Sequence, residues 1–269
     1  MAYSLLRDKP TIERILRNDT YLNIYGIGDL DDFFWPYTTW YGSGMNGRHD
    51  AVVLVYSGME TPTVLALARE STPTATLLQT IAPALPERFH AHLTVGLDVA
   101  LRRTHELESF GLHYKMALTR PEAMRESASA VTSVRGPGEI VALEMRDIDE
   151  IRALYDESYP GNWFDPRMLE TRRYYGVRDA GRLVSIAGIH VYSPRYRVAA
   201  LGNITTLPAY RGRGFGTLVT AHLCRVLVDE GLAVGLNVKA DNHAAIASYR
   251  KIGFEIVAPY EEFLVRRRR

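Results

Sequence analysis

The chain has 269 residues, enough for two domains of ordinary size, and its 46% hydrophobic and 23% charged residues are typical of a globular protein. Its formal net charge of +1 excludes a global field that would attract nucleic acid or an anionic membrane surface. No apolar run reaches about 18 residues, no secretory leader begins the chain, and Cys224 has no second cysteine to pair with, so we expect a cytoplasmic protein without a membrane partner.

The first half of the sequence alternates short helical and strand-like segments. Thr11 is expected to cap the first helix, and Gly58 and Pro62 separate two β-branched runs that should form a hairpin. In chain order, we expect a helix over 11–17, strands over 51–56 and 64–68, a helix over 77–85, a strand over 89–95, a helix over 99–110 and a strand over 114–118.

A small and polar stretch separates the two halves of the chain. Residues 122–138 read EAMRESASAVTSVRGPG and end in the turn-forming sequence Gly-Pro-Gly. We therefore place a domain over 1–130, a linker over 131–138 and a second domain over 139–269.

The second half alternates strands and helices more clearly. Asp147 and Asp165 are expected helix caps, and Pro166 suits a first helical position. In chain order, we expect a strand over 140–143, a helix over 147–159, a hairpin of strands over 174–178 and 183–191, a strand over 198–206, a helix over 215–230 and a strand over 232–239. Alternating strands and helices around one sheet predict an α/β or α+β domain.

A glycine-rich loop joins the strand over 198–206 to the apolar helix after it. It reads Arg211-Gly212-Arg213-Gly214-Phe215-Gly216, and Thr217 follows. Glycines let a phosphate approach the backbone, and the free N–H groups of a helix's first turn favour negative charge. Neither a P-loop nor a dinucleotide fingerprint fits, because no lysine follows the last glycine and the glycine spacing differs. The loop predicts a pyrophosphate cradle, with an ordinary basic surface turn as the alternative.

Two motifs in this half resemble those of a known superfamily. The loop has the form Arg/Gln-x-x-Gly-x-Gly/Ala, and residues 241–254, DNHAAIASYRKIGF, have the form Asn-x-x-Ala-x-x-x-Tyr-x-x-x-Gly-Phe. In this order they resemble motifs A and B of the GNAT superfamily of acetyltransferases. The resemblance covers about residues 138–260 and implies a mixed central sheet flanked by helices.

The first half resembles, more loosely, a second and degenerate GNAT-like domain of the α/β class. At the position of the glycine loop it reads Glu70-Ser-Thr-Pro-Thr-Ala, which contains no glycine. A similar N-terminal region occurs in glycine N-acyltransferase-like proteins. We therefore expect a smaller α/β domain that has lost its cofactor loop.

The GNAT resemblance implies acetyl-coenzyme A as co-substrate and no metal. Backbone groups of Thr206 and Leu207 would hold the acetyl carbonyl and the pantetheine arm, Asn242 would bind the pantetheine, and Tyr249 would protonate the leaving thiolate. A phenol suits this role because its hydroxyl is still protonated at neutral pH. The residues implied in cofactor binding are Thr206, Leu207, Arg211, Gly212, Arg213, Gly214, Phe215, Gly216, Thr217 and Asn242.

The resemblance does not assign a general base to a residue of this sequence. Many members carry a glutamate on the strand before motif A, but the strand over 198–206 has no acidic residue, and Ala200 stands near the expected position. His190 is the best substitute for a catalytic base, with Tyr192 beside it, because a histidine titrates near neutrality. A purely structural histidine is the alternative.

The acceptor is implied only as a class, a small-molecule amine or an amino acid. Trp163, Phe164, Tyr174 and Tyr175 fall where the superfamily's substrate loops lie, so they form either an apolar wall for the acceptor or a packing surface. The resemblance also allows a homodimer, which no sequence feature supports directly.

Two functions stay open from the sequence. One is an acetyl-coenzyme A-dependent N-acyltransferase in which the amine attacks the thioester directly, which the presence of Asn242 and Tyr249 favours. The other is a non-catalytic protein that binds or senses acyl-coenzyme A, which the missing base favours.

Overall fold

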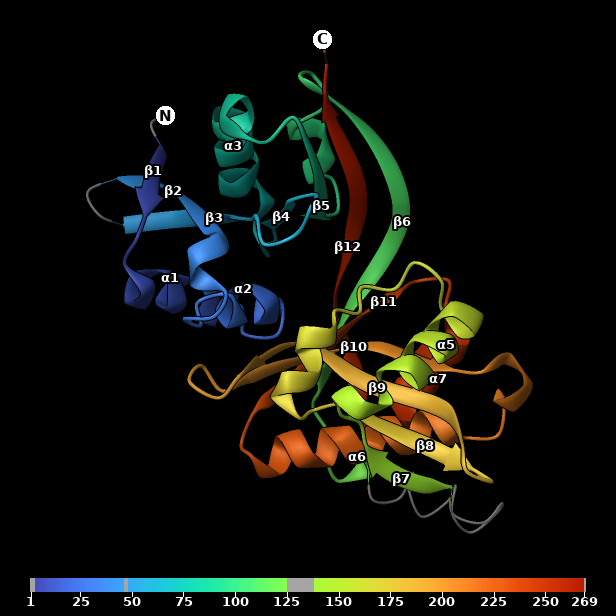
Figure 1. The fold of residues 1–269 in the computed structure, drawn as a ribbon. Coiled ribbons are helices and arrows are strands. Elements are labelled where there is room, and N and C mark those ends of the chain that lie inside the picture. Colours follow the sequence, from blue (N-terminus) through green and yellow to red (C-terminus); the bar gives the residue numbers. More distant parts are fainter. Residues whose placement is uncertain (1–2, 46–47, 125–137, 269) are drawn as a thin grey trace. The chain divides into compact units, whose positions relative to one another are not determined.

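The computed structural model describes residues 3–45, 48–124 and 138–268, which form two compact units (Figure 1). Unit 1 comprises Met1–Lys115, Val238–Asp241 and Ile256–Arg269, and unit 2 comprises Met116–Asn237 and Asn242–Glu255. The predicted linker, apart from Gly138, lies outside the described residues, so the predicted domain bounds stay a prediction. Among the described residues, no helix is long and apolar enough to span a membrane.

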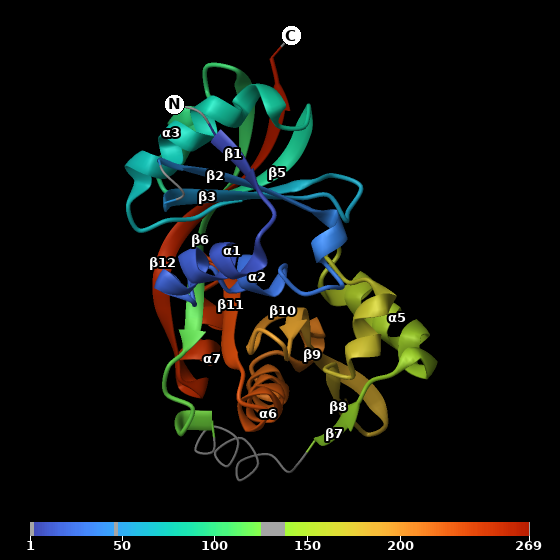
Figure 2. The same cartoon turned by 90° about the vertical axis from the view of Figure 1, so that its left-hand side faces the viewer.

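Unit 1 is a mixed sheet with helices on both faces. Its elements are β1 (Tyr3–Leu6), α1 (Lys9–Leu16), α2 (Ile24–Gly28), β2 (Thr38–Met45), β3 (Arg48–Tyr56), β4 (Thr63–Ala66), α3 (Ser71–Ile81), β5 (Arg88–Thr94), β6 (His105–Leu118) and β12 (Phe254–Arg267). The strand order is β1-β2-β3-β4-β5-β12-β6, with β4 and β5 parallel. Figure 2 shows α3 on one face of β2 and β3 and α1 with α2 on the other.

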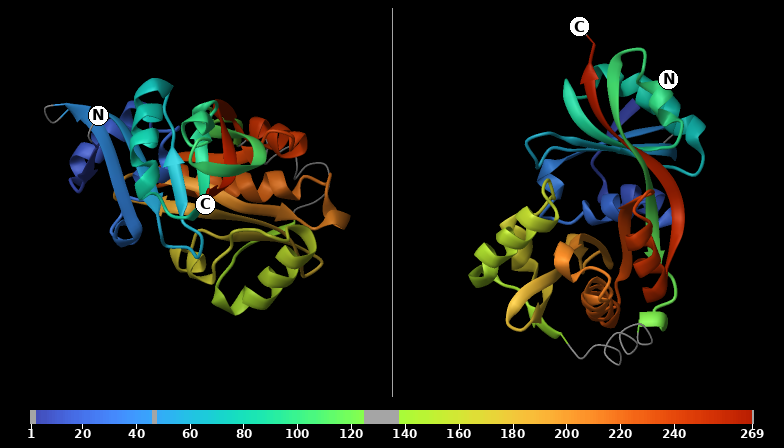
Figure 3. Two further views of the ribbon diagram at one scale, coloured as in Figure 1. Left: turned by 90° about the horizontal axis from the view of Figure 1, so that it is seen from above. Right: turned by 90° about the vertical axis from the view of Figure 1, so that its right-hand side faces the viewer.

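The long strands β6 and β12 run side by side (Figure 3). Both contribute residues to the two units, as does β11 of unit 2. In unit 1, β12 pairs with β5 in antiparallel register from Tyr260–Thr94 to Arg266–Arg88. The last strand of the sequence is therefore an interior strand of the unit that contains the first residues.

Unit 2 is built around further strands and the helices that pack on them. Its elements are β7 (Glu139–Ala142), α5 (Ile148–Ser158), the 3-10 helix η6 (Pro166–Thr171), β8 (Tyr175–Asp179), β9 (Arg182–Ser193), β10 (Val198–Thr206), the 3-10 helix η7 (Pro208–Tyr210), α6 (Phe215–Asp229), β11 (Ala233–Lys239) and α7 (His243–Ile252). The order is β7-β8-β9-β10-β11, and only β10 and β11 are parallel. Because α5 and α6 both pack on β9, this strand is buried along most of its length.

The elements next to the glycine-rich loop agree with the prediction. The strand over 198–206 is β10, and α6 begins at Phe215 as its apolar spacing requires. The helix ends before Gly231, whose φ of 74° is the left-handed conformation expected after a helix C-terminus. The predicted mixed sheet flanked by helices is confirmed.

Two local predictions in the first half are wrong. The helix expected over 99–110 is instead a short 3-10 turn followed by β6, because hydrogen bonding to β12, more than a hundred residues later, overrides local helix propensity. The cap of α1 is Asp8, whose carboxylate accepts from the N–H of Thr11 at 2.9 Å, so Thr11 lies inside the helix.

Candidate active site

The parallel strands β10 and β11 pair along only part of their length. The ladder runs from Val198–Ala233 to Leu201–Leu236, and residues 202–206 of β10 have no partner on β11. We call the point where this ladder ends the fork. Beyond the fork, the backbone N–H and C=O groups on this edge of β10 form no hydrogen bonds with β11. They are therefore available to a ligand that lies along the strand.

The unpaired part of β10 is held in an unusual conformation. Asn203 has a φ of 54°, which is uncommon for a residue with a side chain, although asparagine tolerates it better than most. Tyr155 donates a hydrogen bond to the Asn203 carbonyl at 2.8 Å, and the Asn203 amide donates to the Tyr174 hydroxyl at 3.0 Å. Burial raises the pKa of both tyrosines, so they remain protonated partners that fix the strand beside the fork.

The loop after β10 presents a run of backbone donors. Gly212 and Gly214 have φ values of 73° and 86°, and the second is the N-cap of α6. The N–H of Arg211 donates to Pro208 at 3.2 Å and that of Leu218 donates to Gly214 at 2.9 Å. Among the described residues, no acceptor within the chain is recorded for the six N–H groups from Gly212 to Thr217. Backbone donors of this kind at the start of a fifteen-residue helix suit an anionic ligand.

The two loop arginines already have partners in the chain. Arg211 donates to the carbonyls of Thr206 and Ser158, both at 3.2 Å. Arg213 forms an ion pair with Asp179 at 3.1 Å, and its guanidinium lies 4.9 Å from the centroid of the Phe215 ring. These side chains therefore fasten the loop to β10, α5 and β8.

The predicted residues next to the loop are also tied to the scaffold. The Thr206 hydroxyl lies 2.8 Å from that of Ser185, and a Cβ on Gly216 would lie 3.1 Å from the Thr206 oxygen. Leu207 is buried, its N–H donates to Val184 at 2.9 Å and its carbonyl accepts from Tyr210 at 2.8 Å. Both residues predicted to hold the acyl and pantetheine groups are thus fixed in place next to the loop.

The motif B residues lie on α7. The Asn242 side-chain oxygen accepts from the N–H of Ala245 at 3.2 Å and caps the helix, a role that sequence analysis did not assign. Thr217 and Ser248 join α6 to α7 through hydroxyl oxygens 2.6 Å apart.

Tyr249 is 9% exposed, and its ring contacts Phe254 at 5.9 Å between centroids. Burial, with smaller effects from Tyr159 and Cys224, raises its pKa, so the phenol is protonated at neutral pH and can donate a proton.

His190 of β9 lies at the fork. A Cβ built on Gly202 would lie 1.5 Å from Cδ2 of His190, so the imidazole occupies the space that a side chain at position 202 would fill. The other base candidate, Tyr192, donates a hydrogen bond to Glu230 at 2.8 Å, beyond the end of α6. The structure therefore brings His190 to the fork and directs Tyr192 to another partner.

The four aromatic residues suggested for the acceptor fall into two groups. Phe164 packs at 5.2 Å from Tyr155 and 5.6 Å from Tyr174, while Tyr175 packs at 4.6 Å from His222, so these side chains contribute to packing within unit 2. Trp163 is 42% exposed and is the one of the four that could contact an acceptor.

Sequence analysis did not single out Asn203, Ser158 or Ser185, which shape this region. The one local signal was an asparagine inside a strand-forming run, since asparagine favours left-handed backbone. The hydroxyls of Ser158 and Ser185 reach this region through partners far away in the sequence, Thr205 and Thr206.

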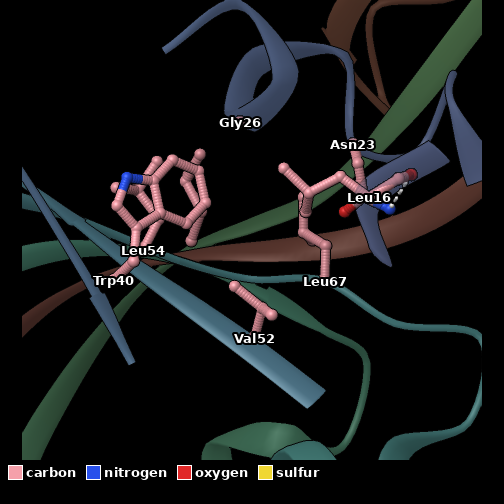
Figure 4. A pocket seen from close by; sticks show the side chains of 8 residues that line it. Leu16, Asn23, Gly26, Trp40, Val52, Leu54 and Leu67 are labelled. Carbon is pink, nitrogen blue, oxygen red and sulfur yellow. Dashed lines mark hydrogen bonds between the residues drawn. The ribbon is translucent and has the colours of Figure 1, made fainter. Parts of the chain in front are cut away.

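Unit 1 contains a small pocket with about 270 Å³ of empty volume, part of it open to solvent. Trp40 and Leu54 line one side and Leu16 and Leu67 the other (Figure 4). The Asn23 amide in its wall donates to the Leu16 carbonyl at 3.2 Å. Its lining has no titratable side chain, so acid–base chemistry has no support there. No group of three or more His, Cys, Asp or Glu that could hold a metal occurs in the described part of the chain.

Comparison with known proteins adds to this geometry. The model of the acetyltransferase (GNAT) family matches residues 144–254. N-alpha-acetyltransferase RimI of Mycobacterium tuberculosis is 37% identical over 109 residues, which is 38% of this chain and 65% of that protein. Mycothiol acetyltransferase of Rhodococcus jostii is 29% identical over 231 residues, 80% of this chain and 67% of that protein.

Among solved structures, a tandem GNAT protein from the clavulanic acid biosynthesis pathway aligns with 99% of this chain and 98% of its own, with a TM-score of 0.56 and 18% identity. Both halves of the chain therefore share the GNAT fold. The chain spans between about a third and two thirds of the length of the curated relatives it matches. With the fork, the loop and α7 in the expected order, residues 144–254 form a domain of the acetyltransferase (GNAT) family.

Proposed function

We propose that the protein is an acetyl-coenzyme A-dependent N-acetyltransferase whose reaction takes place at the fork of unit 2. The observation that carries the proposal is the run of six backbone N–H groups, Gly212 to Thr217, with no recorded acceptor in the described chain. The run follows directly on the unpaired edge of β10, so a pyrophosphate at the loop and a pantetheine arm along the strand suit one extended ligand.

In this proposal the co-substrate supplies an acetyl thioester and the chain supplies proton transfer. The amine nitrogen forms a bond to the acetyl carbon while the carbon–sulfur bond breaks. Tyr249 gives its phenolic proton to the departing sulfur, a role that requires a phenol still protonated at neutral pH. His190 takes the proton that the nitrogen releases, and an amine that arrives neutral needs no stronger base.

The acceptor class follows from the relatives' names. RimI is named as an N-alpha-acetyltransferase, which points to an amine as acceptor, and the Rhodococcus enzyme is named as a mycothiol acetyltransferase, which points to a small molecule. Because the second relative matches most of this chain, we favour a small-molecule amine or an amino acid over a protein. A cytoplasmic location and a homodimer stay predictions from the sequence.

A non-catalytic acyl-coenzyme A sensor is the second candidate. It is favoured by β10, which carries no carboxylate anywhere from Val198 to Thr206. Binding without turnover on any amine is the behaviour that distinguishes it from an enzyme.

The test is calorimetric titration with acetyl-coenzyme A, followed by assay of thiol release against a panel of amines and amino acids. Gly212→Asp should raise the Kd at least tenfold, since it adds a negative charge to the anion site. Gly181→Asp is the matched control, because Gly181 also has a positive φ and no atom within 4 Å of an added Cβ, yet lies in the β8–β9 turn. Equal Kd values for the two variants would show that the loop is not the cradle.

A further inference from the structure

Three residues on neighbouring strands face the same side of the unit 2 sheet at the fork. In the parallel ladder, Leu201 pairs with Leu236, so the next residues, Gly202 and Asn237, point to the opposite face from that pair. His190 of the adjacent strand lies over Gly202 on this same face. The imidazole, the glycine and the Asn237 amide therefore form one row across β9, β10 and β11.

The Asn237 side chain carries an unexplained polar atom. Its Oδ1 is buried and has no hydrogen-bond partner within the part of the chain that the structure describes. The residues on either side, Leu236 and Val238, are 2% and 7% exposed. A buried acceptor without a donor costs free energy, so such an atom in a native structure calls for a ligand or another compensating partner.

The position of this atom identifies the part of a ligand it would meet. The anion loop begins after Thr206, and Asn237 lies at the other end of the unpaired stretch of β10. Residues 202–206 span about 17 Å at the usual rise of a strand, which is comparable to an extended pantetheine arm. A ligand with its pyrophosphate at the loop thus brings its acyl end, and the nitrogen that attacks it, to the fork.

We infer that Asn237 positions the acceptor amine, with its Oδ1 accepting a hydrogen from the reacting nitrogen. This inference rests on the proposed function. A neutral amide suits the task because it binds an amine N–H without favouring the charged ammonium form, as a carboxylate in the same place would do. Gly202 contributes by leaving room for His190 in the same row. The neutral nitrogen is then held between an acceptor and a base.

The test uses two coenzyme A derivatives and needs no knowledge of the natural acceptor. S-(N-methylcarbamoylmethyl)-coenzyme A carries an amide N–H where the attacking nitrogen would lie, and S-(2-oxobutyl)-coenzyme A, which has the same length, carries a methylene group there. The parent protein should bind the amide derivative about fivefold more tightly, the contribution of one net hydrogen bond. Calorimetry measures both Kd values.

Variants assign the preference to one atom. Asn237→Leu should bring the ratio of the two Kd values to about one and leave acetyl-coenzyme A affinity within about twofold of the parent, whereas Asn237→Asp should keep the preference, since its side chain can only accept at neutral pH. Thr220→Val is the matched control: the Thr220 hydroxyl is likewise buried without a partner in the described chain, but it lies in α6, so this variant should behave as the parent.

Each outcome separates this inference from the proposed function. If the parent binds both derivatives equally well, or if Asn237→Leu retains the preference, the role of Asn237 is overturned and the proposed function stands. If the parent binds neither derivative nor acetyl-coenzyme A, the proposed function itself fails.

Discussion

Burial sets the protonation state of two neighbouring side chains in unit 2, Tyr249 and Cys224. Burial raises the pKa of the Cys224 thiol well above neutrality, so a thiolate nucleophile is not available there. The same effect keeps the Tyr249 phenol protonated, and a protonated group is what the departing thiolate requires. The two residues thus support direct attack by the amine rather than transfer through an acyl-cysteine.

Replacing Tyr249 by phenylalanine should lower turnover about a hundredfold, since a positioned general acid contributes factors of this order. The Kd for acetyl-coenzyme A should stay within about twofold of the parent value, because only a hydroxyl is removed. Thiol release with the acceptor found by the amine panel, together with calorimetry, measures both quantities. Tyr192→Phe serves as control, since that hydroxyl bonds to Glu230. Unchanged turnover in Tyr249→Phe would show that Tyr249 is not the general acid.

At the residue scale, the sequence predicts features that depend on neighbours along the chain. The left-handed glycines Gly212 and Gly214 and the helix that follows them agree with the prediction, because glycine spacing and helix periodicity are local, while cofactor binding by this loop stays a prediction. The partners of Arg211 and Arg213 could not be predicted, since Ser158 and Asp179 reach them only through the fold. The buried Oδ1 of Asn237 likewise has meaning only once the end of the β10–β11 ladder is known.

At the scale of elements, the capping role of Asn242 can be separated from its proposed role in binding pantetheine. Asn242 caps α7 through its side-chain oxygen, and its amide nitrogen is the group left to bind pantetheine. Asn242→Ala should lower the free energy of unfolding by about 1 kcal/mol, the usual cost of a lost cap.

Asn242→Asp should retain the cap and the stability but weaken acetyl-coenzyme A binding, because a carboxylate cannot donate. Urea denaturation and calorimetry on the two variants give these quantities independently. If Asn242→Asp binds the co-substrate as well as the parent does, the side chain is a cap alone.

Elements whose partners are close in sequence were predicted well, and those with distant partners were not. The β8–β9 hairpin and the unit from β10 to α6 have adjacent segments as neighbours, so alternation and turn residues were sufficient. β6 and β12 pair with each other although more than a hundred residues lie between them. In β12, Pro259 also disguises the strand pattern, since proline within a run argues against a strand.

At the scale of the whole molecule, each unit contains one parallel strand pair among its described strands, and the two pairs differ in how much of the first strand is hydrogen-bonded to its partner. In unit 1, β4 pairs with β5 over all four of its residues, from Thr63–His90 to Ala66–Leu93. The Thr94 hydroxyl then accepts from the N–H of Ala68 at 3.0 Å, which continues the connection past the end of β4. Unit 1 therefore has no fork, and the loop before α3 has no glycine.

This difference predicts that one chain binds one acetyl-coenzyme A, at unit 2. Calorimetric titration should give a stoichiometry of one per chain, and Gly212→Asp should weaken this single site at least tenfold, with no second site of the parent's affinity. A stoichiometry of two would contradict the assignment of unit 1 as a domain without a cofactor site. So would a site in Gly212→Asp that binds acetyl-coenzyme A with the affinity of the parent.

Unit 1 instead holds a cluster of buried titratable groups. The carboxylate of Glu262 of β12 lies 3.5 Å from Nε2 of His92 of β5 and 3.6 Å from Nε2 of His113 of β6, and it accepts a hydrogen bond from Tyr260 at 2.6 Å. Lys115, 1% exposed, has its ammonium 4.8 Å from the centroid of the Tyr260 ring. Burial lowers the pKa of His92 to about 4 and that of Lys115 to about 7.

The lowered pKa of His92 predicts an acid-sensitive fold. Between about pH 6.5 and 4 the unfolded chain takes up a proton at His92 while the folded chain does not, so the stability present above pH 6.5 is lost as the pH falls. His92→Gln should reduce this loss by up to about 3 kcal/mol, measured by urea denaturation across the range.

Burial raises the pKa of Asp29 to about 7, so protonation of Asp29 stabilises the folded chain as the pH falls. This effect is the same in the parent and in His92→Gln, so it cancels when their stabilities are compared. His243→Gln, the same change at an exposed histidine of α7, should leave the pH profile of the parent unaltered. If the free energy of unfolding changes with pH in the same way in the parent and in His92→Gln, the pKa of His92 is not lowered by folding. The acid sensitivity of unit 1 would then come from other groups. These include His90 and His105, whose pKa values burial also lowers, and Glu262, whose pKa is lowered by His92 and His113 although burial acts to raise it.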